Sequence, residues 1–105
     1  MIVQSRLESD GTLVLTVTAK TLTSTDAAEF RESAKLAIAN SAGGVAVDCS
    51  ELEFIDSSGV GALLHVNNLL PEARRPVRLT HLGPKVLATL ELMRVHRQFE
   101  LDPGN

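Results

Sequence analysis

Hydrophobic and polar residues alternate along the first part of the chain, on both sides of a short polar segment. Every second residue from Leu13 to Val17 is apolar, which gives residues 12–18 one fully apolar face and one mixed face. The connecting Asp10-Gly11 pair is typical of tight hairpin turns, because glycine accepts the positive φ angle that such turns need. The pattern predicts a β-hairpin formed by residues 1–8 and 12–18.

A different spacing follows the threonine-rich residues 19–25, which we expect to form a loop. Thr25 or Asp26 can cap a helix that continues to about Asn40, with its polar residues on the outer side. Gly43-Gly44 then ends this unit. The apolar residues have the i, i+4, i+7, i+8 spacing of a helix face that packs on a core, namely Phe30, Ala34, Ala37 and Ile38.

The centre of the chain, residues 45–70, combines a strand with a capped helix. Val45 to Cys49 is a short, nearly unbroken apolar run, which suits a strand covered on both faces. Asp56, Ser57 and Ser58 are all good N-cap residues for a helix over residues 57–70. Glycines at 59 and 61 would leave the backbone of its first turn open to close approach by a partner.

The last third of the chain repeats the strand and helix pattern. Residues 77–82 alternate as a strand, with Val77, Leu79 and His81 on one side. Gly83-Pro84 begins another helix, because proline fits the first helical position. Residues 99–101 can form a final edge strand, and 102–105 a tail. The third helix has the apolar stripe Val86, Leu87, Leu90 and Met93.

This order predicts one α/β domain over residues 1–105, with its core at about 2–101. We expect a small mixed sheet of four to five strands packed with about three to four helices. On a helical wheel, the apolar residues of 60–70 cover an arc of roughly 220°, more than a helix that faces one core needs. Either a neighbouring helix or a partner protein covers the surplus.

Composition excludes several classes of protein. The formal charge of −3 and the absence of Trp and Tyr argue against a nucleic-acid binder. Arg74, Arg75 and Arg78 form a basic group that is better read as solvated surface. The single cysteine, Cys49, cannot form an internal disulfide and is expected to be buried and reduced. No run of about 20 apolar residues could cross a membrane, so we expect a cytoplasmic protein without membrane insertion.

No catalytic, cofactor or metal pattern is present. The serines lie outside a Gly-x-Ser-x-Gly motif, and Gly59-Val60-Gly61 lacks the third glycine of a dinucleotide-binding loop. His65, His81 and His96 are scattered, without the spacing of a base or a metal set. We therefore expect neither enzymatic activity nor a cofactor.

Ser57 and Ser58 have two interpretations. They are ordinary helix-capping residues, or one of them accepts a phosphoryl group. Phosphate at this position would sit at the positive end of a helix dipole and add about −1.5 to −2 charges beside Asp56. Such a change would eject a partner rather than unfold the domain.

The segment Phe54-Ile55-Asp56-Ser57-Ser58-Gly59-Val60-Gly61 resembles the signature of STAS domains of the bacterial anti-sigma factor antagonist type. The match extends to Val45–Ser50, to Leu82-Gly83-Pro84-Lys85-Val86 and to Leu90-Glu91-Leu92-Met93. The order of elements agrees from residue 2 to about 101. The serine-bearing form of the signature points to the phosphorylated branch of the family.

The resemblance implies a partner-switching phosphoprotein in transcription regulation. In that family the unphosphorylated domain binds an anti-sigma factor, which is also a serine kinase, and so releases a sigma factor. The kinase phosphorylates the hydroxyl residue after the signature aspartate, here Ser57, with Ser58 as the alternative, and a serine phosphatase resets the switch. By resemblance, the partner-binding surface consists of Asp56, Ser57, Ser58, Gly59, Val60 and Gly61.

One departure from the family pattern keeps a second reading open. Antagonists often carry Gly-x-Leu-Asp after the second strand, with the aspartate near the phospho-acceptor, whereas this chain has Lys20-Thr21-Leu22-Thr23. The alternative is a STAS subunit of a phospholipid-transport ATPase complex, which docks through the same helix without phosphorylation. A stressosome-like scaffold is a third possibility, although such chains usually carry an additional sensory domain.

Overall fold

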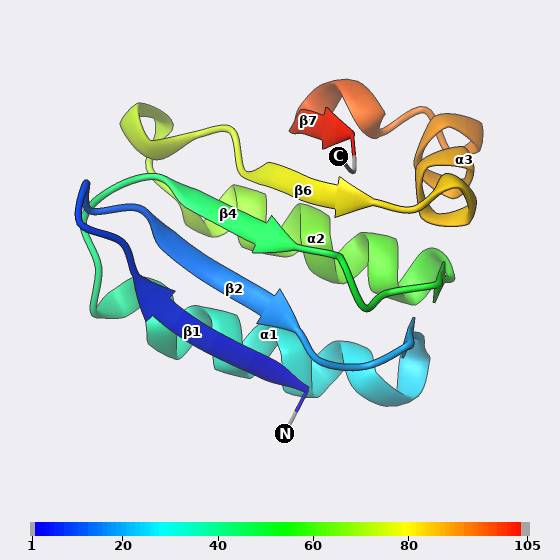
Figure 1. Cartoon of the computed structure of the whole chain (residues 1–105), viewed down its shortest axis with the longest axis horizontal. Helices are drawn as coiled ribbons and strands as arrows, with labels where there is room; N and C mark the ends of the chain where they lie inside the picture. Colours follow the sequence, from blue (N-terminus) through cyan, green and yellow to red (C-terminus); the bar gives the residue numbers. More distant parts are fainter. Residues whose placement is uncertain (1, 104–105) are drawn as a thin grey trace.

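A computed structural model of the chain describes residues 2–103 and has two layers, a mixed sheet and a pair of helices (Figure 1). The five strands lie in the order β1-β2-β4-β6-β7. Their bounds are β1 Val3–Leu7, β2 Leu13–Val17, β4 Val45–Asp48, β6 Arg78–Leu82 and β7 Glu100–Pro103. The helices are α1 Ser24–Ala39, α2 Ser57–Leu69 and α3 Pro84–Leu92. The predicted α/β class and order of elements are confirmed.

The N-terminal hairpin is formed as predicted within the described residues, which do not include Met1. β1 and β2 pair antiparallel, with Val3 opposite Val17. At the turn, Gly11 has φ +91°, and the Asp10 carboxylate accepts a hydrogen bond from the Thr12 N–H at 2.9 Å. This bond lowers the pKa of Asp10, because it stabilises the charged carboxylate. The other neighbouring strands of the main sheet pair parallel.

Helices α1 and α2 lie side by side on one face of the sheet (Figure 1). Phe30 and Ala34 of α1, and Val60 and Leu63 of α2, are buried against the strands. Gly61, His65 and Asn68 form the exposed side of α2. A neighbouring helix therefore covers most of the wide apolar arc of α2.

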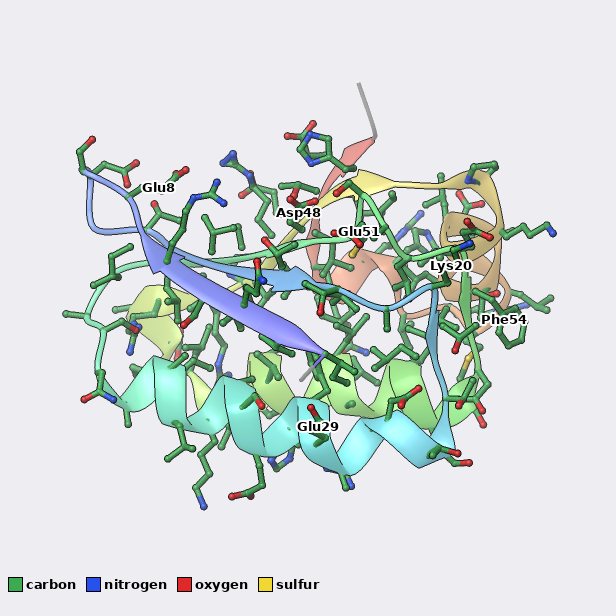
Figure 2. The ribbon with its side chains drawn as sticks, turned by 60° about the horizontal axis from the view of Figure 1, so that its bottom comes forward. Glu8, Lys20, Glu29, Asp48, Glu51 and Phe54 are labelled. Atoms are coloured by element: carbon green, nitrogen blue, oxygen red, sulfur yellow. The ribbon has the colours of Figure 1, made fainter. Side chains whose placement is uncertain are left out.

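The opposite face of the sheet differs from the prediction. Val47 and Cys49 are fully buried on the helical side, but Asp48 is only half-buried and points, with Glu8, away from α1 (Figure 2). The expectation that Val45–Cys49 is covered on both faces is therefore wrong, and Ala46 is shielded by its neighbours in the sheet. Burial raises the pKa of the Cys49 thiol to about 12, which agrees with the predicted buried, reduced cysteine.

A second, two-stranded sheet was not predicted. It pairs β3, Thr21–Leu22, with β5, Phe54–Ile55, in parallel. Residues 19–25 are therefore not simply a loop. Helix α1 begins two or three residues earlier than expected, with Thr23 as its N-cap, so the predicted capping role of Thr25 or Asp26 is wrong.

Three details of the last third of the chain also differ. His81 does not share a face with Val77 and Leu79, because a β-bulge, in which His81 has φ +56°, turns its side chain toward the open face of the sheet. There its Nδ1 lies 3.3 Å from an Asp48 carboxylate oxygen. Met93 ends α3 and is 39% exposed instead of completing the apolar stripe. β7 extends to Pro103, into the predicted tail.

Polar side chains fasten α2 and the following turn to the rest of the domain. Buried Asn67 accepts a hydrogen bond from the Val77 N–H at 2.8 Å and donates one to the Gln98 carbonyl at 3.1 Å. Arg74 donates to the Gly43 carbonyl, and Arg75 to the Leu70 carbonyl. These two arginines therefore hold backbone carbonyls, beyond the solvated role expected for them.

Candidate functional site

The start of α2 is organised by Asp56, the N-cap residue. Its Oδ1 accepts a hydrogen bond from the Gly59 N–H at 3.0 Å, which satisfies one of the unpaired donors at the start of the helix. Of the three predicted capping residues, Asp56 fills this role, and Ser57 and Ser58 are the first two residues of the helix.

The two serines differ in exposure. Ser57 is exposed and Ser58 is half-buried. Within residues 2–103, neither hydroxyl makes a hydrogen bond to another group of the protein. Neither side chain is therefore needed for the cap, and the Ser57 hydroxyl is the more accessible of the two to a modifying enzyme.

Of the next three residues, Gly59 and Val60 are buried and Gly61 is exposed. A Cβ atom at Gly59 would lie 2.1 Å from the Leu22 carbonyl oxygen and 2.6 Å from Cγ1 of Ile55, so glycine is required for α2 to approach the small sheet. Val60 is fully buried. Gly61 is exposed, and a Cβ atom there would meet nothing within 4 Å. Of the signature glycines, only Gly61 leaves open space on the surface.

The small sheet brings the starts of α1 and α2 together. Leu22 is paired with Ile55, and the Asp56 N–H donates to the Leu22 carbonyl at 3.4 Å. The next residue of each strand, Thr23 and Asp56, is the N-cap of its helix. The positive ends of two helix dipoles, each equivalent to about half an elementary charge, therefore lie next to each other beside Ser57.

An exposed aromatic ring borders this site. Phe54 is 48% exposed and projects from the end of the molecule (Figure 2), and the backbone that carries it is fixed by the hydrogen bond from its N–H to the Lys20 carbonyl at 3.1 Å. Its place in the signature segment was noted in the sequence, but its exposure was not predicted. Two-residue strands carry too few positions for alternation to show which side chain points outward.

The histidines of the described residues belong to no group that could bind a metal ion. Within the described part of the chain, no group of three or more His, Cys, Asp or Glu side chains could hold a metal ion. The same residues contain no helix that is both long enough and apolar enough to span a membrane.

Comparison with known proteins agrees with this architecture. A family model described as "Mlab, STAS domain" matches residues 5–101. The comparison with curated proteins gave no match. An anti-sigma factor antagonist from Mycobacterium paratuberculosis has a similar structure, with a TM-score of 0.82 and 22% identity, covering 96% of this chain and 86% of that chain.

Two further structures have a similar fold. The Bacillus cell fate determinant SpoIIAA in its phosphorylated form has a TM-score of 0.68 and 18% identity, with 94% of this chain and 89% of that chain covered. A Ser-to-Glu variant of RsbS from Moorella thermoacetica has a TM-score of 0.77 and 25% identity, with 100% and 89% covered. Because the family model spans nearly the whole chain and the fold agrees, this protein belongs to the STAS domain family.

Proposed function

We propose that this domain is an anti-sigma factor antagonist switched by phosphorylation of Ser57. In its unphosphorylated form it binds an anti-sigma factor that is also a serine kinase, and so releases a sigma factor in the cytoplasm. Phosphorylation ends this binding, and a serine phosphatase restores it. The domain is a substrate and binding partner in this cycle and carries out no catalysis itself.

The observation that carries the proposal is the exposed Ser57 hydroxyl, which has no hydrogen-bond partner within residues 2–103 and lies where two helices begin. Two helix N-termini supply about one elementary charge in total, which favours a phosphoryl group of −1.5 to −2 charges. Asp56 and the half-buried Asp26, in the first turn of α1, already supply negative charge here. The modified site would therefore be strongly negative while the core beneath it stayed unchanged.

The partner would contact a surface smaller than the full signature. Ser57, Ser58 and Gly61 offer exposed or half-exposed positions along the first turns of α2, and Phe54 offers an apolar group beside them. Gly59 and Val60 are buried, so in this proposal they act by positioning the turn. Phosphate at Ser57 would place uncompensated charge against the partner and weaken binding by repulsion and desolvation.

The experiment is a pull-down from lysate of the native organism with wild-type protein and with the Ser57→Asp and Ser57→Ala variants. We expect wild type and Ser57→Ala to capture an ATP-binding serine kinase and Ser57→Asp to lose it. Incubation of the captured kinase with ATP should then phosphorylate wild type, and not Ser57→Ala, at residue 57 by peptide mass spectrometry. Phosphorylation at Ser58 alone would move the acceptor to that residue.

A second candidate is a STAS subunit of a phospholipid-transport ATPase complex. Two observations favour it: the description of the matched family names Mlab, and Thr23 replaces the aspartate that antagonists often carry beside the acceptor. In that case wild type and Ser57→Asp would both capture a transport ATPase, and no kinase would be recovered. Ser57 would then be only a residue of the first helical turn.

A further inference from the structure

Strand β1 is an edge of the main sheet with regularly spaced free backbone groups. The Thr18 N–H donates to the Ile2 carbonyl, and the Glu8 N–H to the Thr12 carbonyl. Because hydrogen-bonded pairs alternate in an antiparallel ladder, the even residues of β1 bond to β2 and the odd residues direct their N–H and C=O groups outward. Within residues 2–103, no partner satisfies these groups of Val3, Ser5 and Leu7.

The same odd residues face a groove between β1 and α1 that has both apolar and polar walls. Two adjoining hollows of about 320 Å³ and 300 Å³ run along it and share Ser5, Ala37 and Asn40 in their walls. Two leucines border the groove and are unusually exposed: Leu7 at 59% and Leu36 at 64%. Figure 2 shows β1 along the front of the sheet with α1 below it, so no other element of the described chain covers this side.

We infer that this edge binds a second copy of the chain, β1 against β1 in antiparallel orientation, with Ser5 of each copy on the two-fold axis. Val3 of one copy then lies opposite Leu7 of the other, and every outward N–H and C=O group of both strands gains a partner. Each Leu7 enters the hollow bordered by Val3 and Leu36 of the other copy, so one arrangement buries the four exposed leucines that border the two grooves.

Charge disfavours one of the neighbouring registers. With Ser5 on the axis, Arg6 stands opposite the uncharged Gln4 of the second copy. A shift of the pairing that places Arg6 on the axis would bring two arginines face to face, which is destabilising. Arg6 is also paired with Glu8 of its own copy at 3.3 Å, which reduces repulsion between the two arginines across the diagonal.

The second copy would leave the start of α2 open. The free edge of β1 is at one side of the sheet (Figure 1). Helix α2 begins near the far end of β4, and β2 lies between β1 and β4. Dimerisation is therefore independent of whether Ser57 is phosphorylated, and its failure would not affect the proposed switch.

Light scattering coupled to size exclusion would measure the mass of the purified chain up to about 1 mM. Because a pair of short strands and four leucines is a small interface, we expect a micromolar dissociation constant. The mass should approach twice 11.3 kDa at high concentration.

Leu36→Asp should weaken the dimer by on the order of 100-fold or more, since each dimer loses two buried leucine side chains. Leu92→Asp, at a residue that is 84% exposed on α3, is the matched control and should dimerise like wild type.

A cysteine variant tests the register directly. Residues on the two-fold axis of an antiparallel pair have Cα atoms about 5.5 Å apart, which a disulfide can bridge. Oxidised Ser5→Cys should therefore form a covalent dimer, whereas Ser9→Cys, at the hairpin turn, should stay monomeric because its copies are on the order of 25 Å apart. Cys49 is buried and should not interfere. A wild-type monomer at about 1 mM, a dimer insensitive to Leu36→Asp, or equal cross-linking at both positions would each overturn the inference.

Discussion

Replacing Gly59 by alanine should destabilise the domain, although alanine is the better helix former. The added methyl group would lie 2.1 Å from the Leu22 carbonyl oxygen, more than 1 Å inside an ordinary contact. This neighbour is backbone, so α2 and β3 must separate. Overpacking of this kind costs about 1–3 kcal/mol or more, and the gain in helix propensity recovers at most about 1 kcal/mol. We expect a net loss of about 1–2 kcal/mol.

For a domain of this size, that loss lowers the melting temperature by roughly 5–15 °C. Thermal unfolding followed by circular dichroism measures it, and Gly61→Ala is the matched control. A methyl group at Gly61 meets open space, so the same substitution two residues later should raise stability by up to about 1 kcal/mol. If Gly59→Ala melted at or above the wild-type temperature, the close approach of α2 to β3 would not be a stability determinant.

Three further predictions test the cap, the core and the cysteine. Ser57→Asp should keep the melting temperature within a few degrees of wild type, because Ser57 is exposed and its side chain makes no hydrogen bond within residues 2–103. Binding of the captured kinase, measured by titration calorimetry, should be lost. A large drop in melting temperature would show that Ser57 is structural. Asn67→Ala should lower the free energy of unfolding, measured in urea, by about 2–4 kcal/mol, because it leaves the Val77 N–H and the Gln98 carbonyl without a partner. A loss below about 1 kcal/mol would mean that water replaces the amide. Above the ordinary thiol pKa of 9.0, wild type should lose about 1.4 kcal/mol of stability per pH unit relative to Cys49→Ala. The reason is that the Cys49 thiol ionises first in the unfolded chain, whereas in the folded protein it stays protonated to about pH 12. Parallel profiles of stability against pH for the two proteins would refute this.

The long elements of this fold were predictable because each has enough residues for its periodicity to show. The hairpin follows from alternation around Asp10-Gly11, and α1 and α2 from apolar residues at helical spacing. The Asp56 cap was also predictable, since a short polar side chain before an apolar helical run has a definite role in satisfying N–H groups.

The details that could not be predicted depend on contacts between distant segments. β3 and β5 have two residues each and exist because they pair across more than 30 positions in the chain. That pairing makes Thr23 the neighbour of Asp56, a relation that the sequence suggested only through resemblance. His81 broke its pattern because a bulge shifted the register by one residue, which reverses the direction of a side chain.

The pairing of β3 with β5 has a consequence for how such a domain can diversify. The small sheet and the two N-caps lie outside the five-stranded sheet, so the residues that would meet a partner in the proposed function are largely different from those that fill the core. If the proposed surface binds a partner, substitutions at positions such as Phe54 and Gly61 would change which protein is recognised at little cost in folding. Gly59 differs from these positions: it is buried, and because it lacks a side chain it lets α2 approach β3 and so ties the proposed contact surface to the scaffold.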